Sequence, residues 1–152
     1  MQPPENYIKL TKVIDLSRIQ LSSPLARFED TLPVRLTTVP LVENFSAAIP
    51  VRRGALANTP CWIDLRLRVT AGRIGFGAYQ SSSGFFAGTP LPILQNNAPQ
   101  EVALALNGLA KVAFIVLYSE KNYASQVEIQ DASVLISPQD WERNKASLSP
   151  LR

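Results

Sequence analysis

The sequence contains no histidine and only one cysteine. Without an imidazole group, Ser-His-Asp and Cys-His catalysis and every metal site that needs a histidine ligand are excluded. Cys61 cannot form a disulfide within the chain and opens an apolar segment, so we interpret it as a buried structural thiol. These absences predict a non-enzymatic, cytoplasmic protein without a metal or other cofactor.

Long apolar runs and long basic runs are also missing. No segment approaches the ~20 apolar residues needed to cross a bilayer, and the opening "MQPPENYIKL" lacks the apolar core of a secretory signal. The net charge is +3, and Arg52-Arg53 is the only adjacent basic pair. Basic residues this scattered do not indicate nucleic-acid binding, so we expect neither a membrane span nor a nucleic-acid partner.

What the sequence does contain is typical of one globular all-β domain over residues 1–152. Apolar residues make up 46% of the 152 residues, and charged residues make up 18%. Twelve prolines are many for a helical protein. In the first half they recur every seven to ten residues, from Pro24 to Pro60, which leaves room for short strands but not for helices.

Alternation of apolar and polar residues predicts where the strands lie. We expect strands over residues 7–17, 32–39, 44–51, 101–107 and 125–136, a hairpin over 61–80, and a central strand covered on both faces over 109–118. Residues 81–99 read as a loop with a possible short strand at Leu91 to Leu94. Asn107-Gly108 predicts a hairpin turn, and a phase shift near Asp131 predicts a bulge.

The C-terminal part predicts a single short helix. Ser137 is a suitable cap, Pro138 suits the first helical position, and Asp140 follows three residues after the cap. The helix should cover about residues 138–146. The complete pattern predicts an antiparallel two-sheet β-sandwich, a galactose-binding-like jelly roll with its core over about 7–136.

The stretch "CWIDLRLRVTAGRIGFGAYQ", residues 61–80, supplies the candidate site. Trp62, Asp64, Arg66 and Arg68 share one face of their strand. If the next strand pairs with it through Ala71-Gly72, then Tyr79 joins that face, with glycines leaving room for a ligand. We hypothesise a shallow site for a sugar or an acidic glycan. The alternative is a solvated face on which Asp64 and the arginines pair across strands.

Three segments carry a resemblance to a known family. "RVTAGRIGFGAY", "EVALALNGL" and "AFIVLYSEKNYASQVEIQDASVLI" resemble carbohydrate-binding-module-like jelly rolls, in which a late strand has the form V-x-I-x-x-x-x-V, filled here by Val127, Ile129 and Val134. More narrowly, "GRIGFG" and "RLTTVPLVENFSAAIPV" resemble the small β-sandwich domain attached to bacterial glycosyltransferases and FkbM-type methyltransferases. The likeness covers about residues 13–136 and brings no catalytic motif with it.

The resemblance implies a non-catalytic carbohydrate-binding or accessory module of glycan or lipopolysaccharide metabolism, with an oligosaccharide as ligand. The alternative is a docking domain that positions a glycosyltransferase or methyltransferase, which an exposed apolar patch at Phe85 and Phe86 would favour. We expect one of these two rings to plug the sandwich end instead. An enzyme acting on sugars is a third hypothesis, and it would need two facing acids among Glu120, Glu128 and Asp131.

Overall fold

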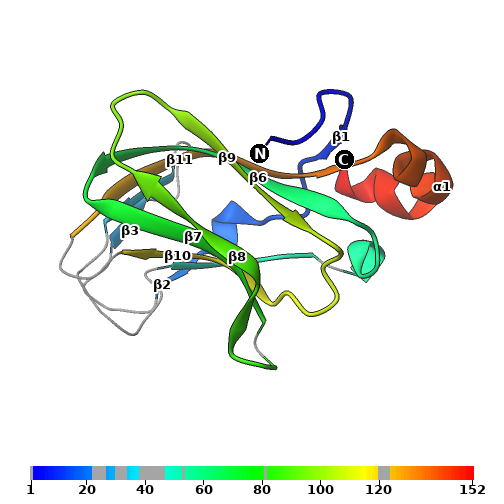
Figure 1. Ribbon diagram of the computed structural model, residues 1–152, viewed down its shortest axis with the longest axis horizontal. Helices are drawn as coiled ribbons and strands as arrows, with labels where there is room; N and C mark the ends of the chain where they lie inside the picture. The colour runs from blue at the N-terminus through cyan, green and yellow to red at the C-terminus, as the bar shows by residue number, and fades with distance from the viewer. Residues whose placement is uncertain are drawn as a thin grey trace.

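The computed structural model describes residues 2–21, 27–29, 34–37, 47–52, 54–80, 82–119 and 124–152. Its strands form two antiparallel sheets that pack face to face, with one short α-helix at the C-terminus (Figure 1). The strands are β1 (Ile8–Leu10), β2 (Gln20–Leu21), β3 (Arg27–Glu29), β4 (Val34–Thr37), β5 (Ala47–Pro50), β6 (Cys61–Ala71), β7 (Arg73–Gln80), β8 (Phe85–Leu94), β9 (Gln100–Leu106), β10 (Phe114–Ser119) and β11 (Gln126–Ile136). The predicted β-sandwich is therefore confirmed.

The two sheets have different strand orders. The six-stranded sheet runs β3-β4-β11-β6-β9, and β1 pairs with the far end of β11. The five-stranded sheet runs β2-β5-β10-β7-β8. The register of β11 against β6 shifts between Ile129 and Asp131, which confirms the predicted bulge.

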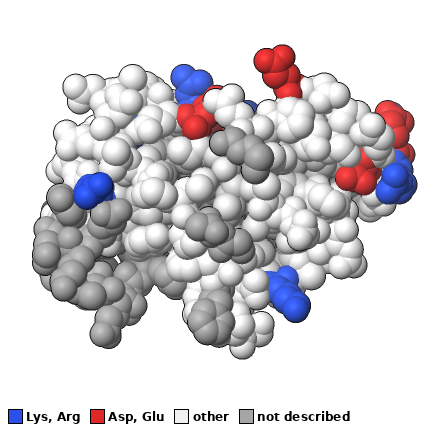
Figure 2. Space-filling model, in the orientation of Figure 1, with Lys and Arg blue, Asp and Glu red and all other residues white. Residues whose placement is uncertain are grey.

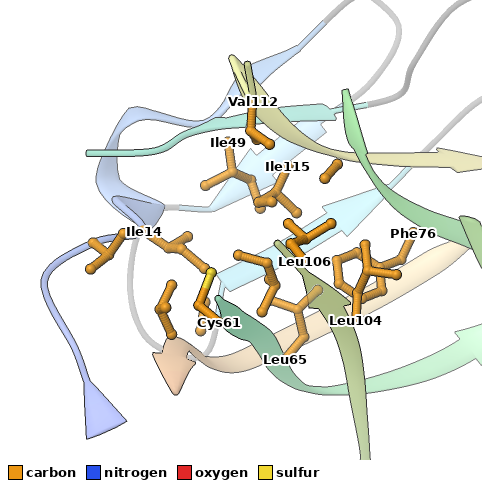
Figure 3. Close-up of a cluster of buried hydrophobic side chains, with 14 of the residues drawn as sticks. Ile14, Ile49, Cys61, Leu65, Phe76, Leu104, Leu106, Val112 and Ile115 are labelled. Carbon is orange, nitrogen blue, oxygen red and sulfur yellow. The ribbon is translucent and has the colours of Figure 1, made fainter. Parts of the chain in front are cut away.

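The core lies between the two sheets. Ile63 and Leu65 of β6 face Phe76 of β7 and Ile115 of β10, and all four side chains are completely buried. Figure 3 shows such side chains from both sheets pointing toward one another. Ile115 lies on a strand with a partner on each side, β5 and β7, so the predicted central position is confirmed. The strand is shorter than the expected 109–118, because residues 109–113 form the connection that leads into it.

The helix α1 (Pro138–Leu148) begins as the sequence predicts. Ser137 caps it by accepting a hydrogen bond from the Asp140 backbone amide at 3.1 Å, and the helix buries its Trp141 side chain. Three 3₁₀ turns complete the described helices: η1 (Leu16–Arg18), η2 (Gly54–Leu56) and η3 (Ser149–Leu151). No helix in the described part of the chain is long and apolar enough to span a bilayer.

Two connections differ from the prediction because both hairpin-like stretches cross between the sheets. β6 belongs to the six-stranded sheet and β7 to the five-stranded sheet, so residues 61–80 are not a hairpin. Asn107-Gly108 likewise leads from β9 in one sheet toward β10 in the other. Glycine suits this crossover since a Cβ atom at Gly108 would collide with the backbone carbonyl oxygen of Ala57.

Two further strand lengths differ from the prediction. The expected loop over 81–99 contains the long strand β8, whose Pro90 and Pro92 are tolerated because β8 is an edge strand. The expected strand over 7–17 shortens to β1, followed by an isolated bridge between Ile14 and Val51.

Candidate functional site

The outer face of the six-stranded sheet carries four of the five sequence-predicted site residues. On β6, Ile63, Leu65 and Leu67 point into the core. Trp62, Asp64, Arg66 and Arg68 therefore point outward together, as the alternation predicts.

The two arginines on this face form ion pairs and hydrogen bonds across strands. Arg68 donates from Nε and Nη2 to Oε2 of Glu128 on β11, at 3.0 and 2.6 Å, and Arg35 of β4 also contacts Glu128 at 3.3 Å. Arg66 donates to Oε1 of Gln130 at 3.1 Å and lies 3.6 Å from Glu101 of β9. The arginines therefore make the cross-strand contacts that the alternative to a ligand site describes.

Asp64 is not a partner of these arginines. It lines a 370 Å³ hollow beneath the N-terminal segment, together with Glu101 and Lys9. Burial raises the pKa of the Asp64 carboxyl above its usual range, and the negative charge of Glu101 adds to this effect. Lys9 pairs with Asp131 at 2.5 Å.

Two of the three acids considered for a glycosidase are engaged in ion pairs. Glu128 contacts two arginines and Asp131 contacts Lys9, whereas Glu120 lies outside the described residues. The described residues also include no group of three or more His, Cys, Asp and Glu side chains that could hold a metal ion.

Tyr79, the fifth predicted site residue, lies in the other sheet. The expectation that it shares a face with Trp62 was wrong, because the chain turns the corner of the sandwich at Gly72. Gly72 has a φ of +80°, and a Cβ atom there would collide with Ser125. Ser125 Oγ accepts a hydrogen bond from the Arg73 amide at 3.1 Å and fixes the corner. Apolar and polar residues alternate on both sides of the glycine whether the chain forms a hairpin or turns such a corner, so the sequence could not distinguish the two.

On the outer face of the five-stranded sheet, Tyr79 joins two other aromatic rings. Phe86 of β8 lies opposite Tyr79 in the register, and their ring centroids are 6.3 Å apart with the rings edge to face. Tyr118 of β10 is 6.0 Å from Phe86 in a tilted arrangement. All three side chains are half-buried. We call Tyr79, Phe86 and Tyr118 the aromatic shelf.

Two glycines allow the shelf to lie directly on the sheet. Gly75 faces Tyr118 in the register, and a Cβ atom at Gly75 would lie only 2.0 Å from Cζ of Tyr118. A Cβ atom at Gly77 would lie 2.6 Å from Cδ1 of Phe86. The G-x-G-x-Y spacing of "GRIGFGAY" therefore supplies a flat floor and one ring, while the other two rings come from β8 and β10.

Phe86 therefore does not plug the sandwich end, since its ring lies over Gly77 on an outer face. The side chain of Phe85 lies outside what the structure describes. The two-residue spacing of Gly75, Gly77 and Tyr79 could reveal from the sequence that they share one face of a strand. It could not reveal Phe86 and Tyr118 as neighbours of Tyr79, because only the strand order brings them together.

Comparisons with known proteins show a fold shared with sugar-binding modules. No protein-family model matches the chain, and a search of curated proteins finds no match. Among solved structures, a family 4 carbohydrate-binding module aligns with a TM-score of 0.56 at 11% identity, covering 77% of this chain and 84% of that one. A xylan-binding module of family 15 aligns with a TM-score of 0.55 at 8% identity, covering 86% and 95%.

A third similar structure is a family 29 carbohydrate-binding module in complex with cellulohexaose. It has a TM-score of 0.52 and 9% identity, and the match covers 88% of this chain and 83% of that one. At these identities the likeness establishes the fold, which is a β-sandwich of the kind seen in carbohydrate-binding modules.

Proposed function

We propose that this protein is a non-catalytic carbohydrate-binding module and that the aromatic shelf is its sugar-binding site. One observation carries the proposal: three half-buried rings, with centroids 6.0 and 6.3 Å apart and planes inclined by 44° and 76°, gather on one outer face beside Gly75 and Gly77. Aromatic faces suit the apolar face of a sugar ring, and tyrosine adds a hydroxyl for hydrogen bonding.

The shared fold supports this proposal. The similar structures include one described as xylan-binding and one solved with cellulohexaose. A site of this shape contacts a sugar chain from one side only, so we expect modest affinity.

The sequence resemblance extends the proposal to an accessory role in glycan or lipopolysaccharide metabolism, next to a glycosyltransferase or methyltransferase in the cytoplasm of a bacterium. The rival docking function needs a large exposed apolar patch. Leu94, 55% exposed, is the one large apolar side chain that is strongly exposed in the described part of the chain. A single exposed leucine is not a large apolar patch, so the described residues favour sugar binding on the shelf over docking.

The sequence-based hypothesis that Asp64, Arg66 and Arg68 bind an acidic glycan stays untested by these contacts, and we place the sugar site on the shelf instead. The cross-strand contacts of the arginines favour a structural role for both. Tyr79 is retained in the proposed site as part of the shelf.

A glycan-array screen tests the proposed function. The wild type should bind at least one oligosaccharide, and Tyr79→Ala and Phe86→Ala should each lose it. Arg66→Ala, on the opposite outer face, is the matched control and should bind normally. An array without any bound glycan, or shelf variants that bind like the wild type, would refute the proposal.

A further inference from the structure

A second hollow lies at the end of the sandwich, away from the aromatic shelf. It has a volume of 820 Å³ and is lined by residues where β6 begins, where β9 ends and at the first turn of α1. This size is within the range of ligand pockets in proteins. Figure 1 shows α1 at this end of the sandwich. The side chains that matter for its chemistry are Tyr7, Trp62, Gln80, Asn107, Lys111 and Asp140.

The end hollow and the shelf use opposite faces of β7. Tyr79 points outward to the shelf, and the next residue, Gln80, lines the end hollow. Likewise Phe86 belongs to the shelf, whereas Ala87 lines the hollow. A ligand in the hollow would therefore touch none of the three shelf rings.

The walls of the end hollow are held by backbone hydrogen bonds. The loop after β9 is tied to η2 by the amides of Leu109 and Ala110, each 3.0 Å from the carbonyl oxygens of Leu56 and Ala57. The Ala113 amide bonds the carbonyl oxygen of Tyr79 at 2.9 Å. The site is thus formed before any ligand arrives, which lowers the entropic cost of binding.

Among the described residues that line the end hollow, Lys111 is the one with a basic side chain. Asp140 accepts a hydrogen bond from the Ser137 hydroxyl at 3.0 Å and lies 3.6 Å from Arg143, so its charge is compensated. Lys111 is exposed and forms no ion pair or side-chain hydrogen bond with the described residues. On the molecular face that Figure 2 draws, the coloured charged side chains lie mostly toward the edges of the molecule.

We propose that the end hollow binds a uronic acid, with the sugar ring against the half-buried Trp62 and the carboxylate on Lys111. A half-buried indole face suits the apolar side of a pyranose, and the amides of Gln80 and Asn107 suit its hydroxyl groups. An unpaired lysine selects for a negative charge on that sugar. The choice of a sugar rests on the proposed function, whereas the site and its preference for an anion do not.

The chain's two tryptophans provide a direct probe. In a ¹⁵N-labelled protein, titration with methyl β-D-glucuronide should shift the indole N–H signal of Trp62, assigned by its absence in Trp62→Phe. The signal of Trp141, which is 6% exposed, should stay in place. Methyl β-D-glucoside and sodium acetate test the sugar and the carboxylate separately, and each should shift Trp62 far less at equal concentration.

Lys111→Gln should weaken glucuronide binding about tenfold, since a hydrogen bond to a charged group is lost. Lys12 is another exposed lysine, and its side chain has no ion-pair or hydrogen-bond partner among the described residues. Lys12→Gln should leave binding unchanged. Phe86→Ala should also leave it unchanged, which separates this site from the shelf. An unshifted Trp62, an equal shift with acetate, or a Lys111→Gln variant that binds like the wild type would overturn the proposal, while the shelf could still bind its own glycan.

Discussion

Replacing Gly75 by alanine places a methyl group where the Tyr118 ring lies. The ring must move away, and overpacking of this kind costs about 1–3 kcal/mol. The contact between Tyr118 and Phe86, with centroids 6.0 Å apart, would be lost as well, and such pairs contribute about 0.5–1.5 kcal/mol. Alanine in a strand recovers about 0.5–1 kcal/mol relative to glycine. Because Tyr118 is only half-buried and can turn toward solvent, we expect a net loss of about 1–2 kcal/mol.

Urea unfolding followed by circular dichroism measures this loss, and a matched glycine serves as the control. Gly54→Ala, where a Cβ atom would meet nothing within 4 Å, should change the free energy of unfolding by less than about 0.5 kcal/mol. In a Tyr118→Ala background, Gly75→Ala should no longer destabilise the protein, because the obstructing ring is gone. If Gly75→Ala costs the same with and without the ring, Tyr118 does not lie over Gly75 and the shelf is wrongly built.

Four further predictions follow from the described contacts. Ile115→Ala should lower the free energy of unfolding by about 2–5 kcal/mol, and a loss below about 1 kcal/mol would show that β10 is not central. Arg66→Ala combined with Arg68→Ala should change it by at most about 2 kcal/mol, since exposed ion pairs contribute about 0–1 kcal/mol each, and should leave glycan binding intact in the array. Burial raises the pKa of the Cys61 thiol to about 12, so a disulfide reagent at pH 8 should label it only after unfolding, and rapid labelling of the native protein would contradict this. The raised pKa of Asp64 means that the folded state binds this proton more tightly than the unfolded state does. The free energy of unfolding should therefore fall as the pH rises from the usual carboxyl range toward the raised pKa. Asp64→Asn should stabilise the protein at pH 7 but not at pH 3, and equal effects at both pH values would argue against the raised pKa.

The sequence predicts the local structure of this protein better than its topology. Alternation on β6, the bulge beside Asp131 and the cap at Ser137 are local features, and the structure confirms all three. The corner at Gly72 and the crossover at Asn107-Gly108 could not be told from hairpin turns, since a turn signal does not say which sheet receives the next strand.

The same limit explains the candidate site. Tyr79 could be identified from its period with Gly75 and Gly77, but its neighbours come from strands 7 and 39 residues further along the chain, at Phe86 and Tyr118. The arginines of β6 are prominent in the sequence, yet their partners on β11 and β9 become visible only in the folded chain. The arginines that stand out in the sequence therefore belong to an outer sheet face on which they pair across strands.

The most direct test of the central claim is saturation-transfer NMR on the glycan that the array finds bound most tightly. Irradiation of the protein's aromatic signals should transfer saturation to the ring protons of the sugar, because these lie against the shelf. The transfer should disappear in Phe86→Ala combined with Tyr118→Ala and persist in Arg66→Ala. Equal transfer in the shelf double variant, or the absence of any glycan that binds the wild type, would contradict the account.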